Sequence, residues 1–205
     1  MNTEILIIDD NFDIFDPLVI ELKERFPDAN VTIQNNPTDG LNYVLANLSK
    51  KIIVLLDYNF QTGQPKGDEI LSKIRKKTSL VYVIIMTAQQ FSTIQHDKLV
   101  DIVNNDALAV VQNTVDTSEI LKIVSKAEQQ LSVRVDCVLE QWIANNHSED
   151  EQNEPYLTTA SGKIYTLKDI LIEIRQQTEF GKKMERNILM LAVDLLTRGK
   201  KQVDD

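Results

Sequence analysis

Residues 5–11 read Ile-Leu-Ile-Ile-Asp-Asp-Asn, and residues 53–59 read Ile-Val-Leu-Leu-Asp-Tyr-Asn. In both stretches, an apolar run of strand length ends abruptly in a carboxylate. A short run without alternation between apolar and polar side chains predicts a strand that is buried on both faces. Such strands belong to parallel sheets with helices on both sides, so these two stretches decide the fold class.

Strand-like and helix-like patterns alternate from this point along the chain. Apolar runs predict five strands, at Glu4–Ile8, Asn30–Gln34, Ile52–Leu56, Val81–Met86 and Ala107–Val111. Helical spacing predicts helices between them, at Phe12–Phe26, Thr38–Leu48, Asp68–Lys76 and Ser92–Asn104. This order predicts an α/β fold with a doubly wound parallel sheet. In such sheets, ligands bind at the carboxyl ends of the strands.

Three carboxylates follow two of these strands: Asp9 and Asp10 come after the first, and Asp57 comes after the third. We expect the two strands to be neighbours, so that the three side chains converge. Like charges in a partly buried site repel one another, and a divalent cation relieves that repulsion. Carboxylate oxygens suit Mg²⁺. Since Thr87 ends the fourth strand beside the same edge, the pattern predicts an aspartate that accepts a phosphoryl group.

The two opening stretches, together with Val-Ile-Ile-Met-Thr-Ala at 83–88, resemble the receiver domains of response regulators in two-component signalling. The resemblance covers about residues 3–128. It implies a flavodoxin-like receiver fold with a five-stranded parallel sheet. It also implies that Asp57 takes a phosphoryl group from a histidine kinase or a phosphotransfer protein.

The resemblance assigns roles to the other residues of this edge. In the family, the acidic pair, here Asp9 and Asp10, holds Mg²⁺ together with the phosphoacceptor and the backbone carbonyl of Asn59. Thr87 would hydrogen-bond a phosphoryl oxygen, and the backbone of Ala88 would lie alongside it.

Two positions depart from the family's pattern. The lysine that normally ends the fifth strand is replaced by Asn113, which can contact a phosphate but brings no positive charge. The aromatic switch residue three positions earlier is replaced by Val110, which cannot swing between inward and outward rotamers. Lys66, in the loop after Asp57, is a candidate for the missing charge, although a solvated loop lysine is the alternative. These departures leave open a pseudo-receiver that folds and binds metal without being phosphorylated.

From Thr117, an apolar stripe continues past the length of a sheet-covering helix. Its members recur every three or four residues as far as Trp142, and there is no Gly or Pro before Pro155. The stripe predicts one long helix over residues 117–146, in which 129–146 form a stalk beyond the receiver domain at 1–128. We expect a homodimer through this helix. The alternative is an ordinary sheet helix with a frayed end.

The remainder of the chain divides at an acidic segment. Residues 147–155 are polar and are expected to form a linker, and residues 156–205 a small output module. In that module, a Ser161-Gly162 turn predicts a hairpin, Thr166 and Asp169 predict a capped helix start, and Gly181 is expected to separate two helices. Its family is not recognisable from the sequence.

The charge distribution bears on the partners. The 205 residues have a net charge of −9, and residues 1–155 carry 24 acidic against 13 basic side chains. This part should repel nucleic acid, so we do not expect DNA to be a partner. No apolar run reaches the length of a membrane span. A single cysteine, Cys137, points to a reducing, cytoplasmic compartment.

Three functions from different classes remain at this stage. The first is a response regulator that signals through a protein-interaction module to an unknown downstream protein. The second is a DNA-binding transcriptional regulator. The third, an enzyme of the haloacid-dehalogenase type, usually needs a carboxylate two residues after the nucleophile, where this chain has Asn59. We therefore expect no enzyme activity beyond self-phosphorylation from small donors and self-dephosphorylation.

Overall fold

The computed structural model describes residues 2–198 of the chain. It divides into two units, Met1–Leu131 and Ser132–Asp205. Each unit has a hydrophobic core of its own. None of the helices within the described range is long and apolar enough to cross a membrane.

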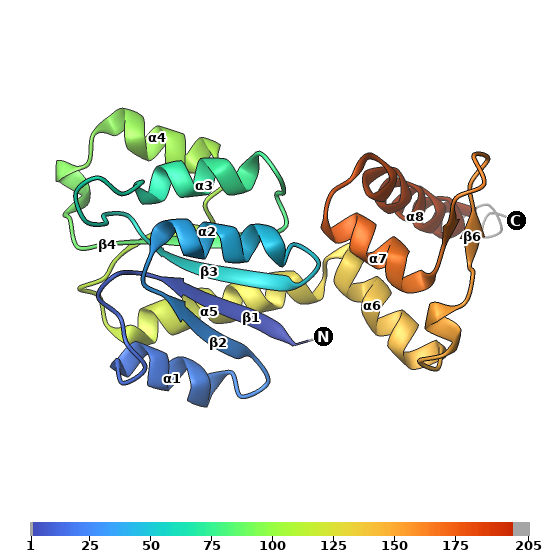
Figure 1. Cartoon of the computed structure of the whole chain (residues 1–205), viewed down its shortest axis with the longest axis horizontal. Coiled ribbons are helices and arrows are strands. Elements are labelled where there is room, and N and C mark those ends of the chain that lie inside the picture. The colour runs from blue at the N-terminus through green and yellow to red at the C-terminus, as the bar shows by residue number, and fades with distance from the viewer. Residues whose placement is uncertain (1, 199–205) are drawn as a thin grey trace, which may run out of the picture. The chain divides into compact units, whose positions relative to one another are not determined.

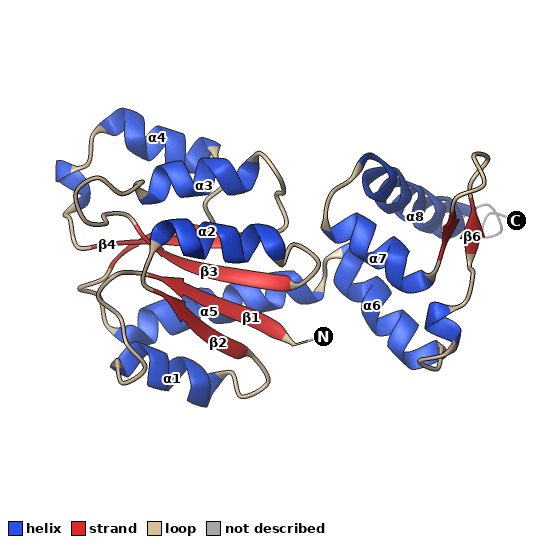
Figure 2. Cartoon of the chain, viewed as in Figure 1, coloured by secondary structure: helices blue, strands red, loops and turns tan. Residues whose placement is uncertain are grey.

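The N-terminal unit is built on one five-stranded parallel sheet (Figures 1 and 2). The strand order is β2-β1-β3-β4-β5, so β1 lies between β2 and β3 and the sheet is doubly wound. The predicted α/β fold class and all five strands are confirmed. The strands are β1 (Thr3–Ile8), β2 (Asn30–Gln34), β3 (Lys51–Asp57), β4 (Tyr82–Thr87) and β5 (Ala109–Gln112).

Helices cover both faces of this sheet, which explains why its strands are apolar throughout. Along β1, Ile5 and Ile7 face one helix layer, whereas Leu6 and Ile8 face the other. The first layer holds α1 (Pro17–Arg25) and α5 (Thr117–Ser132). The second layer holds α2 (Pro37–Ala46), α3 (Gly67–Arg75) and α4 (His96–Asn104) (Figure 1).

Two helices are shorter than their apolar spacing predicts. α1 begins at Pro17 rather than at Phe12, because Asp16 accepts a hydrogen bond from the backbone amide of Leu18 and proline favours the first helical position. The segment predicted as Ser92–Asn104 contains a short 3₁₀ turn, η1 (Phe91–Thr93), before α4 begins at His96.

The prediction of one continuous helix over residues 117–146 is wrong. The chain leaves the helix after Ser132, passes through an extended Arg134, and starts α6 (Val135–Asn146). The apolar stripe is divided between two cores: the residues up to Leu131 pack against the sheet, whereas Cys137 and Ile143 are buried in the C-terminal unit. The continuous helix with a stalk at residues 129–146 is therefore not formed, whereas the homodimer stays a prediction.

A buried ion pair explains this break. Asp136, in the first turn of α6, is 2% exposed and accepts hydrogen bonds from Arg134 at 2.8 Å and from Arg175 at 2.9 Å. The side chains of Arg134, Asp136 and Arg175 are thus largely buried at the point where a straight helix would continue. Nothing in the apolar spacing reveals this, because the break contains neither Gly nor Pro.

The C-terminal unit begins with α6 and η2 (Glu151–Asn153), followed by the hairpin strands β6 (Leu157–Thr158) and β7 (Ile164–Tyr165). The predicted hairpin is confirmed. Residues 147–155, predicted as a linker between domains, instead lie within this unit, where Gln152 donates to the backbone carbonyl of His147 at 3.0 Å.

Two helices complete the unit: α7 (Leu167–Arg175) and α8 (Glu179–Arg198). The predicted capping box is present, since Thr166 accepts from the Asp169 amide and Asp169 accepts from the Thr166 amide. Gly181, however, does not separate the helices, and the break occurs near Gln177, whose φ is 54°. Gly181 lies in α8, where an added Cβ would be 2.0 Å from the Glu173 carbonyl oxygen, so glycine permits close helix contact. Residues 199–205 of the predicted output module lie outside the described range.

Candidate functional site

The ends of β1 and β3 bring three carboxylates together. β1 and β3 are paired in register up to Ile8 and Leu56, so the residues that follow them share one edge of the sheet. Asp9, Asp10 and Asp57 each place a carboxylate oxygen within 4.8 Å of those of the other two. Asp9 and Asp57 are buried, whereas Asp10 is half-buried. The convergence expected from the strand order is thus observed.

Local hydrogen bonds fix the first two of these carboxylates. Asp9 Oδ1 accepts from the backbone amide of Asn11 at 2.8 Å, and the Asn11 side chain donates to Asp10 at 2.8 Å. The side chain of Asn35 donates to the Asp9 carbonyl at 2.9 Å and so ties this loop to the end of β2. The backbone amide of Tyr58, the residue after Asp57, donates to the Met86 carbonyl at 2.8 Å and so ties the end of β3 to β4.

Without a bound cation, the negative charges of these three carboxylates are unfavourable in this partly buried pocket. Burial raises the pKa of Asp57 to about 7, and the negative charge of Asp9 adds to this rise. Burial also raises the pKa of Asp9. Within residues 2–198, no lysine or arginine forms an ion pair with any of the three carboxylates. A hard divalent cation with oxygen ligands, such as Mg²⁺, fits this donor set.

The residues predicted to contact a phosphoryl group lie along the same edge. Thr87, the last residue of β4, is fully buried, and its Oγ1 accepts from the Gln89 amide at 3.1 Å. The Asn113 amide donates to the Thr87 carbonyl at 2.8 Å, and Asn113 lies directly after β5, at the position where the sequence resemblance expects the family's lysine. Ala88 and the Asn113 side chain are exposed. Val110 packs against the core on the side of α2, α3 and α4.

Lys66 immediately precedes α3, and its side chain lies over the ring of Tyr58. Its Nζ lies 6.0 Å from the centroid of the Tyr58 ring. Together with Tyr58, Gln89 and Lys98, it lines a pocket of about 240 Å³ between the ends of β3 and β4 and the start of α4. The structure therefore places Lys66 beside the residue after Asp57, over an aromatic ring.

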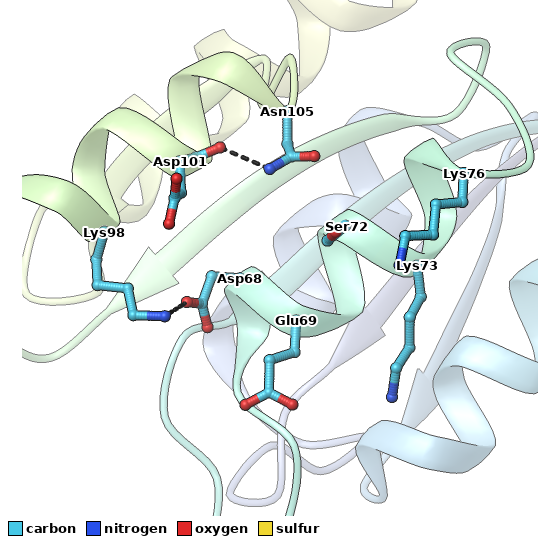
Figure 3. A pocket seen from close by; sticks show the side chains of 8 residues that line it. All are labelled: Asp68, Glu69, Ser72, Lys73, Lys76, Lys98, Asp101 and Asn105. Atoms are coloured by element: carbon cyan, nitrogen blue, oxygen red, sulfur yellow. Dashed lines mark hydrogen bonds and ion pairs between the residues drawn. The ribbon is translucent and has the colours of Figure 1, made fainter.

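An ion pair that the sequence analysis missed joins α3 and α4. Lys98 Nζ lies 2.7 Å from Oδ2 of Asp68, a carboxylate that is 7% exposed. Figure 3 shows this pair at one end of a groove of about 410 Å³ between the two helices. The groove has both acidic and basic lining residues and does not include the three converging carboxylates. An aspartate directly after Gly67 and a lysine 30 positions later gave no sequence signal of their proximity.

Magnesium is expected to stabilise the protein more at pH 8 than at pH 5.5. Because the pKa of Asp57 is about 7 in the ion-free fold and 3.8 in an unfolded chain, the folded state retains a proton that the unfolded state has lost. Stability without metal therefore falls as the pH rises from about 4 to about 7. The cation binds the deprotonated carboxylates and reverses this loss. Thermal unfolding with Mg²⁺ or with EDTA at both pH values measures the effect, and equal shifts at both would contradict it.

Comparisons with known proteins add to this geometry. No protein-family model matches the chain, and no curated protein matches it in sequence. Among solved structures, a receiver domain protein from Methanospirillum hungatei JF-1, described as CheY-like, has 25% identity and a TM-score of 0.51; the match covers 63% of this chain and 97% of that one. The receiver domain of a DNA-binding response regulator from Colwellia psychrerythraea 34H matches with 25% identity and a TM-score of 0.51, covering 62% and 99% of the two chains.

A third match has the same fold at lower identity. The DNA-binding response regulator of the LuxR family from Staphylococcus aureus is 22% identical over 62% of this chain and 98% of its own, with a TM-score of 0.51. The sheet order and the convergence of the carboxylates lie in the N-terminal unit, whose length is close to the share of the chain that these matches cover. The N-terminal unit thus has the CheY-like fold of response-regulator receiver domains, to which its structural neighbours belong, and the C-terminal unit is unassigned.

Proposed function

We propose that this chain is a two-component response regulator that accepts a phosphoryl group on Asp57 in a Mg²⁺-dependent manner. The observation that carries the proposal is the convergence of three carboxylates at the ends of two neighbouring strands of a receiver fold, with no basic partner among residues 2–198. Asp9, Asp10 and Asp57, with the backbone carbonyl of Asn59, would hold the ion. When bound, Mg²⁺ supplies the positive charge that phosphoryl transfer between anions requires.

The chain's own residues have separate roles in this reaction. A carboxylate oxygen of Asp57 forms a bond to phosphorus while the phosphorus–nitrogen bond of a phosphohistidine breaks, and the imidazole leaves with the electron pair. The buried hydroxyl of Thr87, at the next strand end, donates a hydrogen bond to a phosphoryl oxygen, with the backbone of Ala88 alongside it. The exposed side chain of Asn113 contacts another phosphoryl oxygen without neutralising it.

One protein partner acts before phosphoryl transfer and another acts after it. A histidine kinase or phosphotransfer protein in the cytoplasm supplies the phosphoryl group, and the C-terminal unit binds a downstream protein. The acidity of residues 1–155 supports a protein rather than DNA as the partner. DNA binding is nevertheless the second candidate, because two of the similar structures are described as DNA-binding response regulators. A DNA-binding function predicts an affinity for DNA that falls steeply as the salt concentration rises.

The test is the intact mass of the purified chain after incubation with acetyl phosphate. The expected result is the gain of one phosphoryl group with Mg²⁺ and no gain with EDTA. If Mg²⁺ binds but neither acetyl phosphate nor a panel of phosphorylated histidine kinases adds mass, the chain is a pseudo-receiver scaffold. A gel-shift assay at low salt with genomic DNA fragments tests the second candidate, and absence of a shift excludes it.

Replacement of Asn113 by Lys is expected to speed phosphorylation by acetyl phosphate about tenfold, since it places a positive charge beside the developing phosphoryl charge. The rate of mass gain at saturating Mg²⁺ measures this effect. Lys66→Met is the matched comparison, because it removes the charge that lies over Tyr58. No change in Asn113→Lys, combined with a tenfold loss in Lys66→Met, would assign the phosphate contact to Lys66 instead.

A further inference from the structure

The pocket beside Tyr58 lies where two helices of the N-terminal unit begin. We call it the Tyr58 pocket. Its volume of about 240 Å³ is below the roughly 300–1,000 Å³ of sites for drug-sized ligands, so it has room for a small molecule only. Two lysines and two glutamines line it together with Tyr58: Lys66, Lys98, Gln89 and Gln95. No acidic side chain is among its described lining residues.

The hydroxyl of Tyr58 is a donor without a partner at this pocket. Tyr58 is 4% exposed and packs in the core, but its hydroxyl forms no hydrogen bond with the residues that the structure describes. Polar groups in such positions are nearly always hydrogen-bonded, because an unpaired one costs free energy. Burial and the negative charge of Asp68 raise the pKa of the Tyr58 hydroxyl, so it remains protonated and can donate to a ligand.

Both helices that begin at the Tyr58 pocket lack a side-chain cap. α3 follows Lys66 and α4 follows Gln95, and neither side chain accepts a hydrogen bond from its helix. In α1, α2 and α7, the residue before the helix does accept one: Asp16, Asn36 and Thr166. An anion is stabilised at the N-terminus of a helix by the helix dipole. Two such N-termini face this one pocket.

The two lysines make the pocket locally positive within an acidic part of the chain. Lys98 is paired with Asp68 at 2.7 Å, so these two charges balance (Figure 3). An ammonium group has three donors, however, and Lys98 can therefore also donate to a ligand. Lys66 forms no ion pair with a described residue, and its Nζ lies 6.0 Å from the centroid of the Tyr58 ring. Lys66 thus supplies a positive charge that is not balanced.

We propose that the Tyr58 pocket binds a small oxyanion, that is, a compact molecule with a carboxylate or a phosphate group. The anion accepts hydrogen bonds from the Tyr58 hydroxyl and from the ammonium groups of Lys66 and Lys98. The side-chain amides of Gln89 and Gln95, which form no hydrogen bond with described residues, supply further donors. A bound anion therefore links the start of α3 to the start of α4.

The Tyr58 pocket is separate from the site of the three carboxylates. Tyr58 packs on the same side of the sheet as Leu56, and side chains alternate along a strand, so Asp57 lies on the other side of β3. Without a cation, the three carboxylates repel an anion, whereas the Tyr58 pocket needs no metal. Anion binding in EDTA therefore tests this pocket alone, and its outcome is independent of phosphorylation at Asp57.

The experiment is a titration of the isotopically labelled full chain with sodium phosphate or sodium malonate, in EDTA and at constant ionic strength. Two-dimensional NMR spectra follow the backbone amides. Saturable shifts of the amides around the Tyr58 pocket are expected, with a dissociation constant of about 1 mM or lower. Saturation by phosphate alone assigns the site to phosphate groups, and saturation by malonate alone assigns it to carboxylates. If neither anion saturates these shifts, the proposal is wrong.

Three variants distinguish a built site from general attraction to surface lysines. Tyr58→Phe removes only the hydroxyl and is expected to weaken anion binding about tenfold. Lys66→Met removes the unbalanced charge and is expected to weaken it by at least about tenfold. Lys76→Met is the matched control, because Lys76 is an exposed lysine at the other end of α3, and its affinity is expected to equal that of the wild type. Unchanged affinity in Tyr58→Phe, or an equal loss in Lys76→Met, would overturn the proposal.

Discussion

Replacement of Asp57 by Asn is expected to abolish phosphoryl incorporation from acetyl phosphate altogether. The amide is close in shape to the carboxylate, but it lacks the nucleophilic oxygen that must form the bond to phosphorus. Intact mass after incubation with Mg²⁺ measures the result directly. Persistent mass gain in this variant would show that another residue is the acceptor and would refute the assignment.

The same measurement separates metal binding from nucleophilic attack. Asp9→Asn and Asp10→Asn each remove one negative charge from the set of three carboxylates while leaving Asp57 in place. Each is expected to lower the phosphorylation rate at limiting Mg²⁺ by about a hundredfold and to recover in part at high Mg²⁺. Asp13→Asn is the matched control, since Asp13 is an exposed carboxylate in the same loop. Equal losses in Asp13→Asn would indicate a general effect of charge.

Asp57→Asn also has a distinct expected effect on stability. Because burial and the charge of Asp9 hold the pKa of Asp57 near 7, the ion-free fold carries an unfavourable charge above that pH. The neutral amide is therefore expected to stabilise the protein in EDTA at pH 8 and to reduce the gain from Mg²⁺. Gain of stability with loss of function is typical of residues that are selected for chemistry.

The N-terminal unit was predictable from the sequence because each of its strands carries its own signal. The run that ends in Asp57 is apolar throughout, and such a run is compatible with a position buried between two helix layers. Strand order followed from the fold class, and the convergence of three carboxylates followed from the strand order. Neighbouring positions along one sheet edge are fixed by backbone geometry and therefore need no knowledge of side-chain packing.

The failures of prediction share a different physical cause. The break before α6 and the position of residues 147–155 depend on contacts between residues far apart in sequence. The place of Gly181 in α8 depends on its close approach to Glu173, eight positions earlier in the preceding helix. Arg175 reaches Asp136 across 39 positions, and the Lys98–Asp68 pair spans 30. Apolar periodicity reports which side of a helix is buried, but it does not report the charged partner that ends the helix.

Replacement of Arg175 by Met is expected to lower the free energy of unfolding of the C-terminal unit by about 3–5 kcal/mol. Arg175 is 1% exposed, and its guanidinium contacts Asp136 at 2.9 Å and Glu140 at 3.1 Å. Methionine keeps much of the volume but leaves two carboxylates without this partner. Trp142, the single tryptophan, lies in α6, so urea unfolding followed by its fluorescence reports on this unit.

Arg198→Met provides the matched control. Arg198 is also paired with an aspartate, Asp194, but the two side chains are 73% and 49% exposed. An exposed pair one helical turn apart contributes less than about 1 kcal/mol, so this variant is expected to unfold almost as the wild type does. Equal, small losses in the two arginine variants would show that burial of Arg175 does not strengthen its ion pairs.

The pH dependence of the same unit provides the second readout for Arg175. Burial alone would raise the pKa of Asp136, but hydrogen bonds and charges from Arg134 and Arg175 outweigh it and hold the pKa below its ordinary value. A depressed pKa contributes stability above the unfolded value of 3.8, and this contribution is lost as the pH falls through the folded value. The wild-type unit is therefore expected to lose stability as the pH falls below about 5. In Arg175→Met, the pKa of Asp136 is lowered less, so its ionised carboxylate contributes less stability at neutral pH. The unfolding free energy of this variant should therefore fall less steeply as the pH decreases. Parallel pH profiles in the two proteins would mean that Arg134 alone holds Asp136 ionised, and that the break before α6 depends on the local pair rather than on Arg175.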